Sequence, residues 1–322
     1  MNEKELLHNR VVMQSAERAV DPSQFPAAFT DIHYAGQHED QVLDVFLPEA
    51  EGVWPVVVFV HGGGWNFGGR REECISSIFK IVSQGYAVAT VDYRLVPDAV
   101  YPEQIYDVKA AIRYLRAHAA ELHINTDKLV VWGNSAGAHL AALAGGTKNT
   151  EELENPAMGN AEYSGGVDGV LAWYGVYDFA TNKQQLTEQY PDRDTAGDQL
   201  QEAMLHGLEY EASPINHVDE NYPKTLLQQG KMDKLVPWKQ TEEFAEYLRR
   251  VCGPDRVEVD YVPTAGHGDK QIKSDENILR CVKFLDSIYF ADRPCTYERK
   301  PLPELRFVAS TCTRIDPFEA VD

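Results

Sequence analysis

The fold is decided by residues 129–143, which read LVVWGNSAGAHLAAL. The stretch begins with an apolar, β-branched run typical of a buried strand, and it ends in an Ala- and Leu-rich segment typical of a closely packed helix. Between the two lies the pattern G-x-S-x-G, with Ser135 at its centre. A sharp strand-to-helix turn flanked by small residues presents the serine hydroxyl above the sheet, at the positive end of the helix. We therefore predict Ser135 as a nucleophile; the alternative is a glycine-rich turn that contains a serine by chance.

Strands and helices alternate along the chain from Val56 onward. Strands are expected at residues 31–35, 41–47, 56–60, 87–92, 129–132, 167–174, 224–229 and 257–262, and helices at 73–84, 103–122, 199–208, 238–251 and 277–290. This alternation predicts a single α/β domain with a mostly parallel sheet and helices on both faces. The domain is expected to span residues 31–291, with a small lid insertion at about 179–218. An N-terminal helical extension (1–30) precedes it, and a tail of unknown role (292–322) follows it.

A run of three glycines follows the apolar strand at 56–60, in the segment His61-Gly62-Gly63-Gly64-Trp65. Consecutive glycines let the backbone turn freely and direct N–H groups at a ligand. After a central strand, such a loop suits an oxyanion hole. We expect the backbone N–H groups of Gly63, Gly64 and Ala136 to form it; the alternative is a flexible loop.

A serine nucleophile needs a base and an acid that orients the base. Asp233 and His267 each follow a predicted strand directly, and the chain order Ser135, Asp233, His267 is the order that the α/β-hydrolase arrangement requires. Reacting groups gather at the carboxyl ends of the strands in an open parallel sheet. His267 is expected to take the proton from Ser135, and Asp233 to hold the imidazole. Asp178, which follows an earlier strand, is the rival for the acid.

Four aromatic residues are candidates for the walls of a substrate pocket, because they lie near the same strand ends: Trp65, Trp173, Tyr174 and Tyr177. Each is individually more typical of a protein core. For Asn134 and His139, which flank the serine turn, hydrogen bonding and packing are expected rather than chemistry.

The composition excludes several classes of partner. Asp and Glu number 50 against 30 Lys and Arg, a formal net charge of −20, so nucleic acid and anionic membrane surfaces would be repelled. No transmembrane run and no leader pattern are seen, which predicts a cytoplasmic protein. The five cysteines are scattered and suggest no metal site, although Cys295 and Cys312 could pair. No metal or organic cofactor is expected, and a homodimer is an open prediction.

Taken together, these motifs resemble the α/β-hydrolase superfamily. Within it they are similar to the hormone-sensitive-lipase-like esterases and to the related branch of xylan-side-chain esterases and arylformamidases. The resemblance covers residues 41–290 and includes the segment Asp92-Tyr93-Arg94-Leu95. Asn134 stands where the lipase-like group usually has an acid.

The resemblance implies a serine carboxylesterase that acts on short acyl or aromatic acyl esters. Acetyl or feruloyl esters of plant polysaccharide are candidate substrates, either as small molecules or as oligosaccharides. Two alternatives stay open: an arylformamidase or amide hydrolase that uses the same machinery, and a binding module without catalysis.

Overall fold

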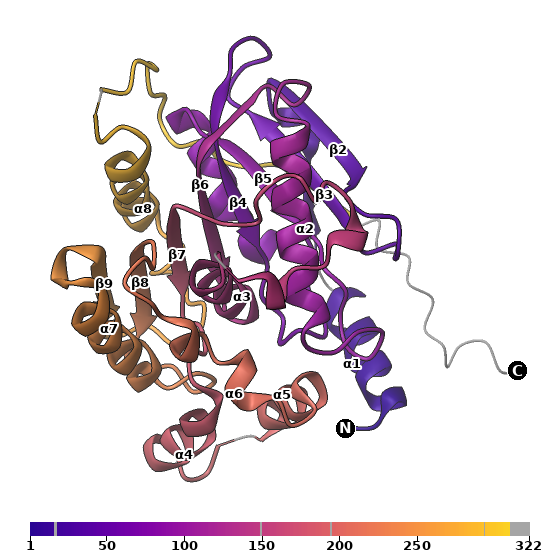
Figure 1. Ribbon diagram of the computed structural model, residues 1–322, viewed down its shortest axis with the longest axis vertical. Coiled ribbons are helices and arrows are strands. Elements are labelled where there is room, and N and C mark those ends of the chain that lie inside the picture. The colour runs from indigo at the N-terminus through magenta and orange to yellow at the C-terminus, as the bar shows by residue number, and fades with distance from the viewer. Residues whose placement is uncertain (16–17, 149, 194, 293, 310–322) are drawn as a thin grey trace, which may run out of the picture.

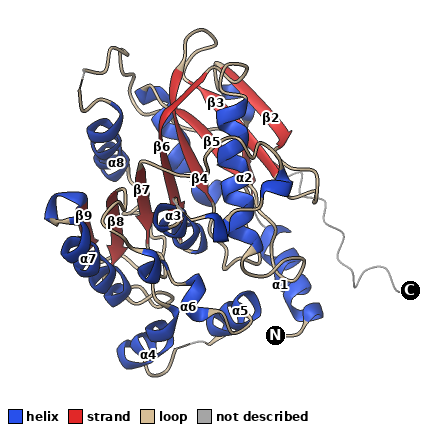
Figure 2. Ribbon diagram, in the orientation of Figure 1, coloured by secondary structure: helices blue, strands red, loops and turns tan. Residues whose placement is uncertain are grey.

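The computed structural model describes residues 1–322 except 16–17, 149, 194, 293 and 310–322. A twisted sheet runs through the middle of the molecule, and helices lie on both of its faces (Figures 1 and 2). The predicted fold class, an α/β-hydrolase with a mostly parallel sheet, is confirmed. No helix among the described residues is long and apolar enough to cross a membrane.

The main sheet has eight strands in the order β2-β3-β5-β4-β6-β7-β8-β9. The pairs β2–β3 and β3–β5 are antiparallel, and every pair from β5–β4 to β8–β9 is parallel. The carboxyl ends of the parallel strands therefore share one edge, where loops can bring side chains together. The strand bounds are β2 Ala27–His33, β3 Val42–Leu47, β4 Trp54–Val60, β5 Ala87–Val91, β6 Ile124–Asn134, β7 Gly169–Trp173, β8 Lys224–Gly230 and β9 Val257–Val262.

The helices divide between the two faces. One hydrophobic core cluster contains side chains of α2, α3 and α7, and the other contains side chains of the 3-10 helix η2 and of α8. The longer helical elements are α1 Glu3–Ser15, η2 Glu73–Gln84, α2 Glu103–Ala117, α3 Ala136–Gly146, α4 Phe179–Gln189, α5 Ala196–Leu205, α7 Trp238–Cys252 and α8 Asp275–Tyr289, and α6 Glu209–Ala212 is a single turn. Short 3-10 turns cover Pro22–Gln24, Glu151–Leu153, Pro156–Met158, Pro214–His217 and Pro254–Arg256.

Three element predictions need correction. The first strand of the main sheet lies at 27–33, not at 31–35, so it begins inside the stretch expected as a helical extension. The helix expected over 103–122 ends at Ala117, and the chain then turns through His123, whose φ is 54°. The strand expected at 129–132 extends back to Ile124, because its first residues pair with Trp54 and Pro55 of β4.

The C-terminal segment contains a strand that the sequence did not reveal. β10 Phe307–Ala309 pairs antiparallel with β1 Arg18–Val20, in a small second sheet. Val20 is fully buried there. The four described cysteines, Cys74, Cys252, Cys281 and Cys295, form no disulfide with one another. The predicted pairing of Cys295 with Cys312 lies outside the described residues.

The segment expected as a lid forms α4, α5, α6 and the turn at 214–217. Figure 1 shows these helices gathered at one end of the molecule. The segment is bound to the body: Tyr101 N–H donates to Met204 O at 2.9 Å, and the Tyr101 hydroxyl donates to Glu211 O at 2.7 Å. Its action as a lid stays a prediction.

Candidate active site

Ser135 lies at the sharp turn between β6 and α3. Its backbone is strained, with φ 52° and ψ −118°, a conformation that L residues rarely adopt. The flanking glycines make the turn possible: a Cβ on Gly133 would lie 2.2 Å from Gly137 O, and a Cβ on Gly137 would lie 2.0 Å from Val60 O. Ser135 N–H donates to Trp173 O at 2.8 Å, which ties the turn to the end of β7.

Three predicted site residues lie within hydrogen-bonding distance of one another. His267 Nε2 is 2.9 Å from Ser135 Oγ, and His267 Nδ1 is 2.8 Å from Asp233 Oδ2. With the proton on Nδ1, the ring donates to the carboxylate and its Nε2 accepts from the serine hydroxyl. This tautomer is the one that a general base for Ser135 requires.

Asp233 is fully buried, and its charge is compensated by hydrogen bonds from neighbouring groups. Its Oδ1 accepts from the N–H groups of Leu235 at 2.8 Å and Val236 at 2.9 Å, and its Oδ2 accepts from Gln229 Nε2 at 2.9 Å. These donors stabilise the charged carboxylate and fix the direction in which it faces His267. The contact of Gln229 with Asp233 was not predicted from the sequence. The signal that could have revealed it was a polar residue at the end of an apolar strand.

The loops that carry Asp233 and His267 are held against each other. Met232 N–H donates to Ala265 O at 2.9 Å, and a Cβ on Gly230 would lie 2.3 Å from the same carbonyl oxygen. Asp269 Oδ2 accepts from Gly266 N–H at 2.7 Å and shapes the histidine loop. Because these contacts are backbone to backbone or local, the loops keep the acid and the base at a fixed separation.

The rival acid, Asp178, has a different place. Its carboxylate caps α4, accepting from Ala180 N–H at 2.9 Å and from Thr181 Oγ1 at 3.0 Å. An N-cap carboxylate satisfies helix donors that have no other partner. The structure therefore brings Asp233, and not Asp178, to the histidine.

The glycine loop lies directly beside the serine. A Cβ on Gly62 would lie 3.1 Å from Ser135 Cβ, and Gly62 N–H donates to Asn134 Oδ1 at 2.9 Å. Gly63 and Gly64 both have positive φ, 102° and 57°. Ala136 is the first residue of α3, where the backbone N–H has no partner within the helix. Ala136 thus follows Ser135 directly, and the contact at Gly62 brings the loop that carries Gly63 and Gly64 to the serine turn. The role of these three N–H groups as oxyanion donors stays a prediction.

His61 supports one peptide of this loop. Its Nδ1 lies 2.7 Å from Gly62 O, and its ring stacks on Tyr93 with centroids 4.5 Å apart. Burial lowers the pKa of His61, so the ring is neutral near pH 7 and can donate from Nδ1. Because a peptide is planar and its C=O and N–H point in opposite directions, holding Gly62 O also sets the direction of Gly63 N–H.

The four predicted aromatic pocket residues have different surroundings. Tyr174 has φ 44° and places its ring 4.6 Å from that of His267. Trp65 donates from Nε1 to His139 Nδ1 at 3.2 Å. Trp173 and Tyr177 pack in the core, Trp173 against Trp132 and Tyr177 against Phe244. Contact with substrate stays a prediction for all four residues.

Asn134 and His139 behave as hydrogen-bonding residues, as expected. His139 joins three segments: it accepts from Trp65 of the glycine loop, lies on α3, and has Nε2 2.8 Å from Ala212 O at the end of α6. Burial lowers the pKa of His139 to about 4. The ring is therefore neutral at pH 7, with its proton on Nε2.

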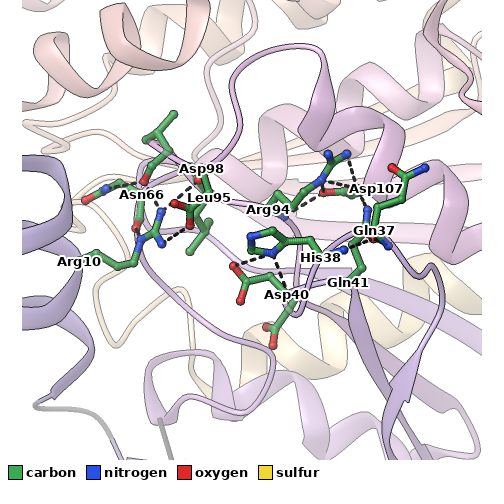
Figure 3. A network of polar contacts seen from close by, with 12 residues as sticks. Arg10, Gln37, His38, Asp40, Gln41, Asn66, Arg94, Leu95, Asp98 and Asp107 are labelled. Atoms are coloured by element: carbon green, nitrogen blue, oxygen red, sulfur yellow. Dashed lines mark hydrogen bonds and ion pairs between the residues drawn. The ribbon is translucent and has the colours of Figure 1, made fainter. Parts of the chain in front are cut away.

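One group among the described residues could offer ligands to a metal ion. Ligand atoms of His38, Asp40 and Asp98 all lie within 4.8 Å of one another. Asp98 already has a cationic partner, because Arg10 Nη1 lies 2.6 Å from its Oδ2 (Figure 3). The expectation that the chain needs no metal stays a prediction.

The topology of the sheet and the serine turn together define an α/β-hydrolase. The chain belongs to the BD-FAE family, whose model matches residues 43–248. The chain is 32% identical over 246 residues to the esterase LipC of Mycobacterium tuberculosis, covering 72% of this chain and 58% of LipC. It is 30% identical over 250 residues to the esterase LipQ of the same organism, covering 76% of this chain and 58% of LipQ. The chain thus spans 58% of the length of these two relatives.

Solved structures agree on the fold. A bifunctional GH43-CE protein of Bacteroides eggerthii is 29% identical with a TM-score of 0.70, over 80% of this chain and 34% of that one. A truncated carbohydrate esterase from gut microbiota has a TM-score of 0.74 at 24% identity, over 84% of this chain and 98% of that one. The predicted resemblance to α/β-hydrolase esterases is confirmed.

Proposed function

We propose that the chain is a serine carboxylesterase in which Ser135, His267 and Asp233 are the catalytic residues. One observation carries the proposal: an unbroken line of hydrogen bonds runs from buried Asp233 through His267 to the hydroxyl of Ser135 at the strained turn. A hydroxyl in this position has its base already oriented, which is the requirement for nucleophilic attack at neutral pH.

The reaction proceeds through an acyl-enzyme. Ser135 Oγ attacks the ester carbonyl carbon while His267 Nε2 takes its proton, and Asp233 stabilises the imidazolium that forms. The tetrahedral intermediate collapses, His267 returns the proton to the leaving alcohol, and the acyl group stays on Ser135. Water, deprotonated by His267, then attacks the acyl-enzyme and releases the carboxylic acid.

The negative oxygen of each tetrahedral intermediate is assigned to the backbone N–H groups of Gly63, Gly64 and Ala136. These groups belong to fixed peptides, so they need no reorganisation when charge develops, and each is worth about 100- to 1,000-fold in kcat. Support comes from the position of the glycine loop beside Ser135 and from the anchored carbonyl of Gly62.

The proposed substrates are short acyl or aromatic acyl esters, with acetyl or feruloyl esters of plant polysaccharide as the class to test first. The esterase names of LipC and LipQ support ester cleavage. Homodimeric assembly and a cytoplasmic location stay predictions from the sequence. Sedimentation velocity would measure the assembly.

The test uses p-nitrophenyl acetate and butyrate with the wild type and Ser135→Ala. We expect kcat/KM to fall at least about 10⁴-fold in the variant. Ser164→Ala, in an exposed loop, is the matched control and should leave kcat/KM unchanged. Equal turnover by wild type and Ser135→Ala would overturn the assignment of the nucleophile.

Two further measurements separate the alternatives. A fluorophosphonate probe should label the wild type and not Ser135→Ala, whereas a binding module would not be labelled at all. An N-formyl arylamine and a feruloyl ester offered in competition distinguish amide from ester preference. We expect the ester to be consumed first.

A further inference from the structure

Helix α1 contacts the segment that follows the glycine loop. Arg10 on α1 is only 3% exposed, although it carries a full charge. Its Nε donates to Asn66 O at 3.0 Å, its Nη1 to Asp98 Oδ2 at 2.6 Å, and its Nη2 to the carbonyl oxygens of Leu95 and Val96. Figure 3 shows the guanidinium among these partners. The side chain therefore ties α1 to two separate loops at once.

Asn66 is the point at which α1 meets the glycine loop. Its side chain is fully buried and its hydrogen-bonding groups are occupied: Nδ2 donates to Leu6 O at 3.0 Å and to Val96 O at 2.9 Å, and Oδ1 accepts from Asn9 Nδ2 at 2.7 Å. Together with the bond from Arg10, three residues of α1 hold this one asparagine. Asn66 is two residues beyond Gly64, at the end of the predicted oxyanion loop.

The backbone of Asn66 contacts the glycines directly, so holding Asn66 also restrains them. Asn66 N–H and Phe67 N–H both donate to Gly63 O at 3.0 Å. The Gly63 carbonyl shares one planar peptide with the N–H of Gly64, and the two point in opposite directions. Fixing the carbonyl therefore fixes the direction of Gly64 N–H, one of the proposed oxyanion donors.

The glycine loop needs such outside support. Glycine has the largest choice of backbone conformations, so three in a row can reorient a peptide at low cost. A rotated peptide would present a carbonyl oxygen, not an N–H, to the developing negative charge. The restraint must come from the residues around the glycines. α1 supplies one restraint through Asn66, beside the contact of His61 with Gly62 O and the bond from Val96 N–H to Trp65 O.

We propose that Arg10 and Asn66 are positioning residues, and that α1 holds the Gly63–Gly64 peptide in the orientation that stabilises the oxyanion. The inference rests on the proposed esterase function, since it assigns the support of its oxyanion hole. Arg10 and Asn66 act through the backbone and do not touch the reacting atoms. Loss of the restraint should therefore affect the transition state more than the binding of substrate.

The experiment compares Arg10→Met and Asn9→Ala with Met13→Ala, a control on the same helix at a position that is 44% exposed. For p-nitrophenyl butyrate we expect kcat to fall about 10- to 100-fold in Arg10→Met and a few-fold in Asn9→Ala, with KM within about twofold. The control should match the wild type. Asn9→Ala removes a single hydrogen bond to Asn66, so it gives an answer if Arg10→Met does not fold.

A second measurement separates positioning from general loosening. A trifluoromethyl ketone with a butyl chain adds to the serine and forms a tetrahedral oxyanion, whereas butyrate binds as a ground-state product. We expect the Ki of the ketone to rise in proportion to the loss of kcat, while the Ki of butyrate is unchanged. Unchanged kcat and ketone affinity in both variants, or equal weakening of ketone and butyrate, would overturn the proposal. Absence of turnover and of fluorophosphonate labelling in the wild type would instead overturn the esterase function.

Discussion

At the scale of single residues, Gly137 shows how little space the serine turn leaves. A Cβ at this position would lie 2.0 Å from Val60 O, a backbone atom that cannot move without displacing β4. We expect Gly137→Ala to lower the free energy of unfolding by about 3 kcal/mol. Gly36→Ala is the matched control, because nothing lies within 4 Å of its Cβ, and should change stability by less than about 0.5 kcal/mol. Urea denaturation measures the unfolding free energy of both variants. Equal stability of the two would contradict the conclusion that the serine turn has no room for a side chain at Gly137.

His139 should give the protein a measurable pH dependence of stability. Its pKa is about 4 in the folded protein because of burial, against 6.5 in an unfolded chain. Between these pH values the unfolded state binds one more proton than the folded state. The contribution of His139 to the free energy of unfolding is therefore fully present above pH 6.5, and it is lost as the pH decreases towards 4. The slope from this group is about 1.4 kcal/mol per pH unit.

His139→Gln tests this linkage, because the amide keeps one donor and one acceptor and does not titrate. The difference in unfolding free energy between pH 7 and pH 5 should be smaller in the variant than in the wild type, whatever its absolute stability. Urea denaturation at the two pH values supplies the numbers. Parallel losses in both proteins would show that His139 is not the group that titrates.

Ser135, Asp233 and His267 could be located from the sequence because each directly follows a strand, and parallel strands end at one edge. The structure adds what no local pattern contains. Arg10 is 56 residues from Asn66 and 88 from Asp98 in the chain, and only the folded protein brings them together. Gln229 likewise stands out only once its amide is seen beside Asp233.

At the scale of elements, α5 lies over the glycine loop. Leu200 Cδ1 is 2.9 Å from where a Cβ on Gly64 would stand, so this side chain covers the loop next to the proposed oxyanion hole. In Leu200→Ala the space above the loop should open to longer acyl chains. We expect the ratio of kcat/KM for p-nitrophenyl octanoate to that for acetate to rise about 10-fold. Gln199→Ala, exposed on the same helix, should keep the wild-type ratio, and an unchanged ratio in Leu200→Ala would remove α5 from the substrate site.

Elements with a clear apolar pattern could be predicted closely, as with β9 at 257–262, where apolar residues alternate with Glu258 and Asp260. The N-terminal part of β6 could not, because Asn125, Thr126 and Asp127 carry no apolar pattern; the strand begins there because Ile124 and Asn125 pair with Trp54 and Pro55 of β4. β1 and β10 have three residues each, too few for a periodicity to be recognised. Their pairing depends on a contact between opposite ends of the chain, which local sequence does not encode.

At the scale of the whole molecule, the net charge of −20 should select among substrates by their charge. An ester that carries a carboxylate, such as a p-nitrophenyl hemisuccinate, is repelled by the negative field of the protein. Salt screens this repulsion, because the Debye length falls from about 30 Å at 0.01 M to about 8 Å at 0.15 M ionic strength. We expect kcat/KM for this ester to rise several-fold over that range, while kcat/KM for neutral p-nitrophenyl acetate changes little. Stopped-flow or steady-state assays would measure both, and an equal response of the two esters would show that the field does not reach the site.

The β1–β10 pair has a consequence for how the protein is made. At about 5 to 20 residues per second, the ribosome takes on the order of 15 to 60 s between the synthesis of β1 and that of β10. Throughout that interval the edge of β1 that β10 will occupy has no strand to pair with, and the bond from Val20 N–H to Arg71 O can form only after residue 71 has been made. The small sheet of β1 and β10 therefore cannot form until residues 307–309 have left the ribosome.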